Sequence, residues 1–148
     1  MAASAWRTYE SFVEFQGDNT IDLDNDTFKM ALFLSTSNAA TLTTNAAYAD
    51  LTNEHANANG YTTGGKTLTM TWAHSGQTTT LDCDDQVWTA SGGSIVARFA
   101  VIYSSTSGKL VAYCLLDTTP ADITTTTGNT LTITINASGI LTFTGATA

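Results

Sequence analysis

Residues 95–116, with the sequence IVARFAVIYSSTSGKLVAYCLL, constrain the fold of this chain more than any other stretch. They contain two apolar runs, 95–103 and 110–116, which are joined by the polar residues 104–108. Alternate side chains of a strand point to opposite faces, and both faces of these runs are mainly apolar. We therefore expect two antiparallel strands that are covered on both sides. The connection suits a hairpin loop because Gly108 can adopt a positive φ.

Short segments with strand-like patterns lie on both sides of this hairpin. Residues 28–34, FKMALFL, form a second strongly apolar run. Other segments alternate polar and apolar residues and are rich in threonine or aromatic residues, which suits strands with one face on the core. These are residues 67–72, 78–82, 86–89, 130–135 and 140–144. Residues 136–139, Asn-Ala-Ser-Gly, have turn chemistry, and we expect them to join the last two segments in a closing hairpin.

The N-terminal segment, residues 1–19, has a helical pattern instead. Trp6, Tyr9 and Val13 fall on one helical stripe, and Ser4 is a suitable N-cap. This pattern predicts a short amphipathic helix within residues 3–15.

Residues 35–59 have no clear periodicity and are rich in Ala, Asn, Thr and Ser. We expect a long surface excursion, with a helical turn at residues 46–51. Taken together, about eight short strands separated by turn signals predict a mainly β fold. The expected architecture is a single domain, residues 1–148, folded as an antiparallel β-sandwich or barrel with a short N-terminal helix.

Charge and composition exclude several classes of partner. The net charge is −8, with 13 acidic residues against 5 lysines and arginines. Such an acidic surface gains nothing from counterion release on nucleic acid and is repelled by anionic membranes. The sequence has no leader-like segment and no apolar run of about eighteen residues, so we expect a chain that is made in the cytoplasm and does not cross a membrane. In that setting Cys83 and Cys114 are expected to be reduced core thiols, with a disulfide as the alternative.

Two short motifs resemble ligand-binding loops. Residues 60–67, GYTTGGKT, match the P-loop pattern, but that motif requires a helix after the lysine and the following LTMTW alternates like a strand. We interpret the glycines as a turn that enters a strand.

The second motif is Asp22, Asp24 and Asp26, which match the start of a calcium loop. The pattern lacks the glycine at the sixth position, where Thr27 stands, and the glutamate at the twelfth, where Phe33 stands. We favour three solvated carboxylates along the edge of a strand, and a bound calcium ion remains the alternative.

Candidates for catalysis are few. His55 and His74 are the only histidines, and neither has a neighbouring nucleophile in a recognisable setting. Adjacency is the sole signal for an acid/base pair of Glu54 and His55, and it is a weak one. Two histidines without a cysteine pair at ligand spacing argue against a zinc site. We therefore expect no enzymatic activity and no cofactor.

Several blocks of the sequence resemble, in order, a family of small structural proteins of tailed bacteriophages. The resemblance extends from Tyr9 to Phe143, and residues 37–47 depart from it. It implies a virion component assembled in the host cytoplasm, specifically a capsid decoration (cement) protein on the capsid surface that binds the major capsid protein. The alternative is a tail- or fibre-associated module that contacts the host surface. The blocks are residues 20–32, 48–54, 60–65, 84–88, 97–103, 110–113 and 137–141.

A decoration protein is expected to act as a homo-oligomer, and a trimer would match a three-fold axis of a capsid. Aromatic residues in a terminal segment can anchor an interface, so we predict that Trp6, Tyr9, Phe12 and Phe15 help to dock the domain. The alternative is that these rings complete the core of the domain itself.

Overall fold

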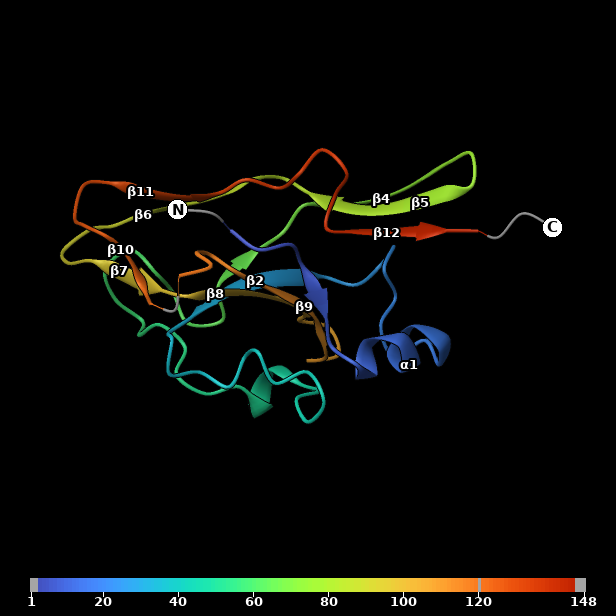
Figure 1. The fold of residues 1–148 in the computed structure, drawn as a ribbon, viewed down its shortest axis with the longest axis horizontal. Coiled ribbons are helices and arrows are strands. Elements are labelled where there is room, and N and C mark those ends of the chain that lie inside the picture. Colours follow the sequence, from blue (N-terminus) through green and yellow to red (C-terminus); the bar gives the residue numbers. More distant parts are fainter. Residues whose placement is uncertain (1–2, 120, 146–148) are drawn as a thin grey trace.

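Two layers of antiparallel strands face each other in the computed structural model, which describes residues 3–119 and 121–145 (Figure 1). The first layer is a five-stranded sheet with the order β1-β9-β8-β2-β3. Its strands are β1 (Arg7–Thr8), β9 (Leu110–Leu115), β8 (Phe99–Ser104), β2 (Phe28–Phe33) and β3 (Lys66–Thr67).

The second layer contains a three-stranded sheet, β12-β5-β4, and a separate pair, β11-β6. A third pair, β7-β10, lies at one end of the molecule (Figure 1). This mainly β, antiparallel sandwich with one short α-helix confirms the predicted fold class, and no sheet of the described residues closes into a barrel. The strands are β4 (Met70–Ser75), β5 (Thr78–Cys83), β6 (Gln86–Thr89), β7 (Ile95–Ala97), β10 (Ile123–Thr125), β11 (Thr130–Ile133) and β12 (Leu141–Thr144).

The predicted central hairpin is confirmed as β8 and β9, which pair antiparallel with Phe99 opposite Leu115. Every residue of β8 is buried. Gly108 has a φ of 74°, and its N–H donates to the carbonyl oxygen of Ser104 at 2.8 Å. The first apolar run is interrupted at Arg98: β7, before it, pairs with β10, and β8, after it, belongs to the five-stranded sheet.

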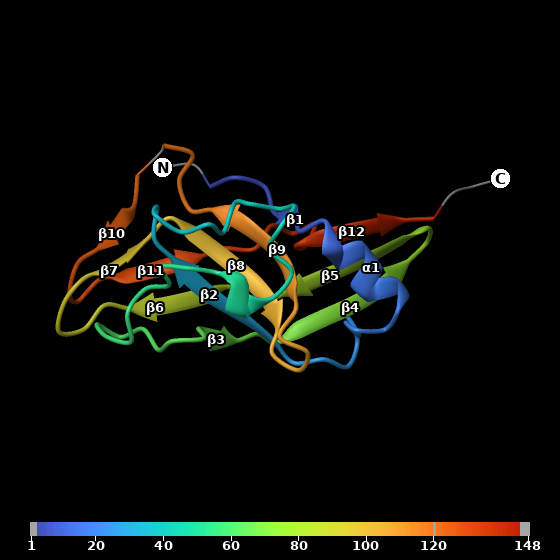
Figure 2. The ribbon, with the colours of Figure 1, turned by 90° about the horizontal axis from the view of Figure 1, so that it is seen from below.

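The two faces of β8 belong to two different cores, which explains why both are apolar. Ala100 and Ile102 belong to the core shared with the second layer. Phe99, Val101 and Tyr103 belong to a separate core on the outer face of the five-stranded sheet. That face is covered by residues 35–59 (Figure 2).

The expected surface excursion is therefore a cover for one face of the sheet. Leu42, Tyr48 and Leu51 pack against the outer core. The predicted helical turn is confirmed as a short 3-10 helix, η1 (Tyr48–Asp50).

The predicted position of the N-terminal helix is wrong. Residues 3–8 run along the edge of the five-stranded sheet, and the helix, α1 (Ser11–Gly17), begins only afterwards. Ser4 does not cap it. Its N–H donates to the carbonyl oxygen of Leu115, and the Leu115 N–H donates to the Ser4 Oγ, both at 2.9 Å. The edge strand β9 offers unpaired backbone groups, and pairing with them outweighs the local helical pattern. Val13, expected on the apolar stripe, is 69% exposed.

The predicted closing hairpin is also wrong. β11 pairs with β6 and β12 pairs with β5, so the two C-terminal strands are not partners of each other. Residues 136–139 form the turn that was expected, but this turn leads from β11, beside β6, to β12, beside β5. The physical reason is that β5 and β6 follow each other almost without a break, and their free edge offers hydrogen-bonding groups along its whole length.

Candidate functional site

Of the four aromatic residues predicted to dock a partner, the structure buries two in the core and leaves two partly exposed. Tyr9 is 0% and Phe12 1% exposed, so both rings are core residues of the domain itself. The Tyr9 hydroxyl donates to the carbonyl oxygen of Ala39 at 2.7 Å, and burial raises its pKa well above the ordinary value. Trp6 and Phe15 pack against the core but stay partly exposed. Of the predicted set, these two are available for contact with another molecule.

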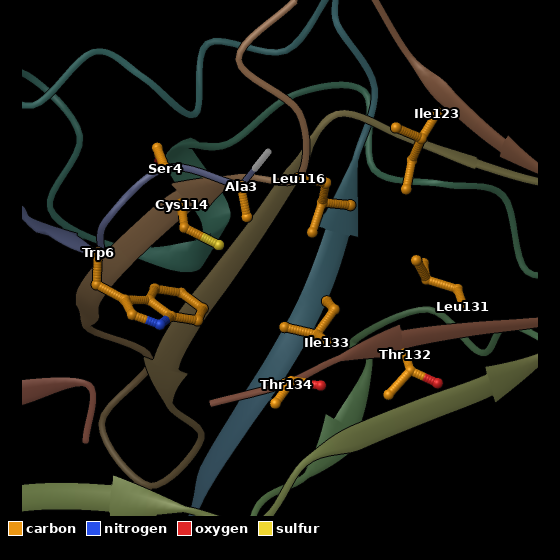
Figure 3. A pocket seen from close by; sticks show the side chains of 10 residues that line it. All are labelled: Ala3, Ser4, Trp6, Cys114, Leu116, Ile123, Leu131, Thr132, Ile133 and Thr134. Carbon is orange, nitrogen blue, oxygen red and sulfur yellow. The ribbon is translucent and has the colours of Figure 1, made fainter. Parts of the chain in front are cut away.

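Trp6 lines a cavity of about 310 Å³ at an open side of the sandwich (Figure 3). Its walls come from the N-terminal segment, from β9 and the residue after it, and from β10 and β11. Figure 3 shows Cys114, Leu116 and Ile133 turned toward the same space as the indole ring. The cavity volume is at the lower end of the range for small-molecule and anchor pockets. It is about twice that of a cavity of about 150 Å³ that holds one benzene ring.

Both cysteines are free and buried. Burial raises the pKa of the Cys114 thiol to about 12. The pKa of Cys83 is likewise raised to about 12, first by burial and then by the neighbouring carboxylates of Asp82, Asp84 and Asp85. Because the thiolate is the reactive form, neither thiol is activated for nucleophilic chemistry at neutral pH.

Glu54 organises a polar cluster near the end of residues 35–59. Its carboxylate accepts hydrogen bonds from the hydroxyls of Tyr48 and Tyr61, and from the backbone N–H of Gly64 at 2.7 Å. The Tyr103 hydroxyl donates to the Gly64 carbonyl oxygen at 2.9 Å. The rings of Tyr48 and Tyr103 stack with their centroids 4.4 Å apart. We call these five residues the Glu54 clasp.

The electrostatics of the clasp keep its tyrosines protonated. Burial and the hydrogen bond to Glu54 raise the pKa of Tyr48 and of Tyr61, and burial beside the same carboxylate raises that of Tyr103. The hydroxyls of Tyr48 and Tyr61 therefore remain donors, and the carboxylate is occupied by groups of the fold. The cluster joins residues 35–59 to the glycine-rich loop that follows them. We interpret it as a structural fastening.

The clasp was not found from the sequence because four of its members lie in residues 48–64, which have no clear periodicity, and the fifth, Tyr103, comes from β8. Tyr48 and Tyr61 were the available signal, since they are large aromatic residues in otherwise small and polar surroundings.

The predicted acid/base pair of Glu54 and His55 is not assembled, because no hydrogen bond joins their side chains among the described contacts. His55 is 7% exposed, its backbone N–H donates to the carbonyl oxygen of Leu32 at 2.9 Å, and its ring meets Tyr61 edge to face. The Nε2 atom is buried without a hydrogen-bond partner. Burial lowers the pKa of His55, and the nearby Glu54 opposes this only in part.

His74 lies on the other layer, in β4, and is exposed. Its Nδ1 is 3.0 Å from the Thr79 Oγ1. The two histidines therefore do not form one site.

The three aspartates of the calcium-like pattern lie in a turn and not on the expected strand. Asp22 Oδ1 accepts from the backbone N–H groups of Asp24 and Asn25 at 3.0 and 3.1 Å. Hydrogen bonds from the Asn25 side chain and from these backbone groups lower the pKa of Asp22. Asp26 Oδ2 accepts from the Ser104 Oγ at 2.8 Å. Within residues 3–119 and 121–145, no group of three or more His, Cys, Asp or Glu side chains is placed to hold a metal ion.

The P-loop-like segment leads into β3 and then β4, so the helix that a phosphate site needs does not follow it. The Lys66 ammonium donates to the carbonyl oxygen of Val87 and lies 5.4 Å from the centre of the Trp88 ring. The lysine is thus turned toward the second layer. The segment acts as a turn between residues 35–59 and the sandwich.

No helix in the described part of the chain is long and apolar enough to cross a bilayer. Comparison with protein-family models, with curated proteins and with solved structures finds no match to this chain.

Proposed function

We propose that this chain is a structural protein of a bacteriophage virion, and more specifically a decoration protein that binds the major capsid protein on the outer shell and stabilises that shell. The observation that carries the proposal is the resemblance of its ordered sequence blocks, from Tyr9 to Phe143, to small structural proteins of tailed phages. These blocks include most of β8, part of β2 and the Glu54 clasp, which are elements that build the fold. A family resemblance centred on such elements suits a protein whose role is structural.

Physical properties of the molecule support a non-catalytic role. Glu54 is occupied by hydrogen bonds of the fold, and the two cysteines are buried and protonated. A decoration protein acts in many copies on one shell, so that weak contacts at each site add up. In the proposal the copies form a homo-oligomer, with a trimer as the form that fits a three-fold axis.

The proposed contact with the shell includes Trp6 and the mouth of the cavity beside it. Trp6 is the accessible aromatic residue of the N-terminal segment that opens onto this space (Figure 3). Tryptophan is enriched among residues that dominate interface energies. An apolar side chain of the capsid protein is the occupant that the mainly apolar walls would take.

The test is to mix the purified protein with capsids that lack it and to image them by cryo-electron microscopy. We expect ordered density at symmetry-related sites on the shell and greater resistance of the particle to heat. Trp6→Ala should lower occupancy, while the control Val13→Ala, at an exposed position of the same segment, should not. Absence of density on the shell would overturn the proposal. Density confined to the tail would identify a tail module, for which binding to the host surface is the next assay.

A further inference from the structure

Residues 35–59, which we call the strap, cover an aromatic and apolar sheet face. The face belongs to β2, β8 and β9, and it includes Phe33, Phe99, Val101, Tyr103 and Tyr113. Leu42, Tyr48 and Leu51 are the strap residues that pack on it. Figure 2 shows the strap and η1 crossing over these strands.

The strap is fastened along its length by backbone hydrogen bonds and at its end by the Glu54 clasp. Near its middle, the Tyr48 N–H donates to the Gly108 carbonyl oxygen at 2.8 Å, and the Leu110 N–H donates to that of Ala46 at 3.0 Å. Near its end, Glu54 forms an isolated β-bridge with Phe33 and accepts the hydrogen bonds of the clasp. His55, the next residue, is buried at the same point.

We propose that the strap is an acid-released cover, in which protonation of His55 loosens the Glu54 clasp and uncovers the aromatic face of the five-stranded sheet. The inference goes beyond the proposed virion role and does not depend on it.

The geometry around His55 makes the closed strap intolerant of an extra proton. The imidazole Nε2 is buried without a partner, so a proton placed there would be a buried donor with no acceptor. The titratable groups that face the ring are Glu54 from the strap and Tyr61 from the following loop. From β2, the Leu32 carbonyl oxygen accepts the hydrogen bond of the His55 backbone N–H. The Glu54 carboxylate is occupied by two tyrosine hydroxyls and the Gly64 N–H.

The direction of the pH effect follows from the lowered pKa of His55 in the closed strap. An exposed imidazole in the open strap titrates at about 6.5. The open form therefore binds the proton more tightly than the closed form does. Closure is fully favoured above pH of about 6.5 and weakens as the pH falls toward the lower pKa of the closed form. For each pKa unit by which the closed form lies below the open form, protonation of His55 raises the equilibrium constant for opening by up to about tenfold.

Hydrogen exchange of the full chain, followed by mass spectrometry at pH 7.5 and pH 5.0, tests the proposal. Protection factors, which correct for the intrinsic effect of pH on exchange, should fall at pH 5.0 in peptides covering residues 40–58. Peptides from β8 should keep their protection and serve as the internal reference. Unchanged protection of the strap between the two pH values would overturn the proposal.

The two histidines of the chain provide a matched pair of variants. His55→Leu removes the titrating group and should abolish the fall in protection at pH 5.0. His74→Gln changes the exposed histidine on β4 and should leave the fall intact. A response that survives in the first variant, or disappears in the second, would assign the effect to another group and refute the proposal.

A second variant keeps the proposal testable if His55→Leu does not fold. Tyr48→Phe removes one donor to Glu54, while His55 and its ring contact with Tyr61 are left unchanged. The weaker clasp should let the strap open at higher pH, so that its protection begins to fall earlier in an acid titration. An unchanged midpoint would show that the clasp does not hold the strap.

Discussion

Single residues set the tightest constraints where the glycine-rich loop crosses the edge of the sheet. Gly65 has a φ of +73°, and a Cβ added there would lie 1.9 Å from the Met30 carbonyl oxygen. Gly108 has nearly the same φ, +74°, but open space around the position of a Cβ. The two glycines share a backbone conformation and differ in their surroundings.

This difference predicts unequal effects of alanine. Gly108→Ala should lower the free energy of unfolding by about 1–2 kcal/mol, the cost of a left-handed backbone for a non-glycine residue. Gly65→Ala should cost clearly more, above about 3 kcal/mol, because the backbone of β2 or of the loop must also move. Urea unfolding of both variants measures the difference. Equal losses of stability would contradict the close approach of the loop to Met30.

At the scale of elements, the short helix α1 places a buried residue and an exposed residue next to each other in the sequence. Phe12 in α1 is buried in the core between the layers, whereas its neighbour Val13 is 69% exposed. Phe12→Ala should therefore destabilise the domain by about 3–5 kcal/mol. Val13→Ala should stay within about 0.5 kcal/mol of the original stability. Thermal or urea unfolding tests both, and a mild effect of Phe12→Ala would mean that its ring is not a core residue.

Elements defined by their own composition were predictable from the sequence. The hairpin of β8 and β9 followed from two apolar runs around Gly108, and the helical turn at η1 was expected within residues 46–51. Elements defined by a distant partner were not. Arg7 and Thr8 form β1 only because β9 is there to pair with them, and β11 pairs with β6 although a turn leads from it to β12.

The same distinction applies to the candidate site. Glu54 and His55 stood out by adjacency, but the groups around them include Leu32 of β2 and, through Gly64, Tyr103 of β8. A single sequence identifies which residues are unusual and does not say which of them meet. The strap was expected to be an exposed loop because most of its residues are small and polar. Its few large apolar residues, such as Leu42, are the ones that pack on the sheet.

At the scale of the whole molecule, the charge imbalance acts on the folded state. The chain has thirteen acidic side chains and five lysines and arginines, which gives a net charge of −8. Folding brings these negative charges closer together than they are in the unfolded chain, so their mutual repulsion lowers stability. At 0.1 M salt, the repulsion between exposed charges that are more than about 10 Å apart is largely screened. Screening should therefore stabilise this protein.

We expect the melting temperature to rise by about 2–4 °C between 10 mM and 300 mM sodium chloride at pH 7.5. This rise corresponds to roughly 1 kcal/mol in the free energy of unfolding. Asp24 and Asp84 provide the control, because both side chains are exposed. The double variant Asp24→Asn/Asp84→Asn changes the net charge from −8 to −6. Its melting temperature in low salt should be higher and its response to salt smaller. A melting temperature that falls with salt would mean that attractive pairs outweigh the overall repulsion, and the acidic surface would then be a source of stability.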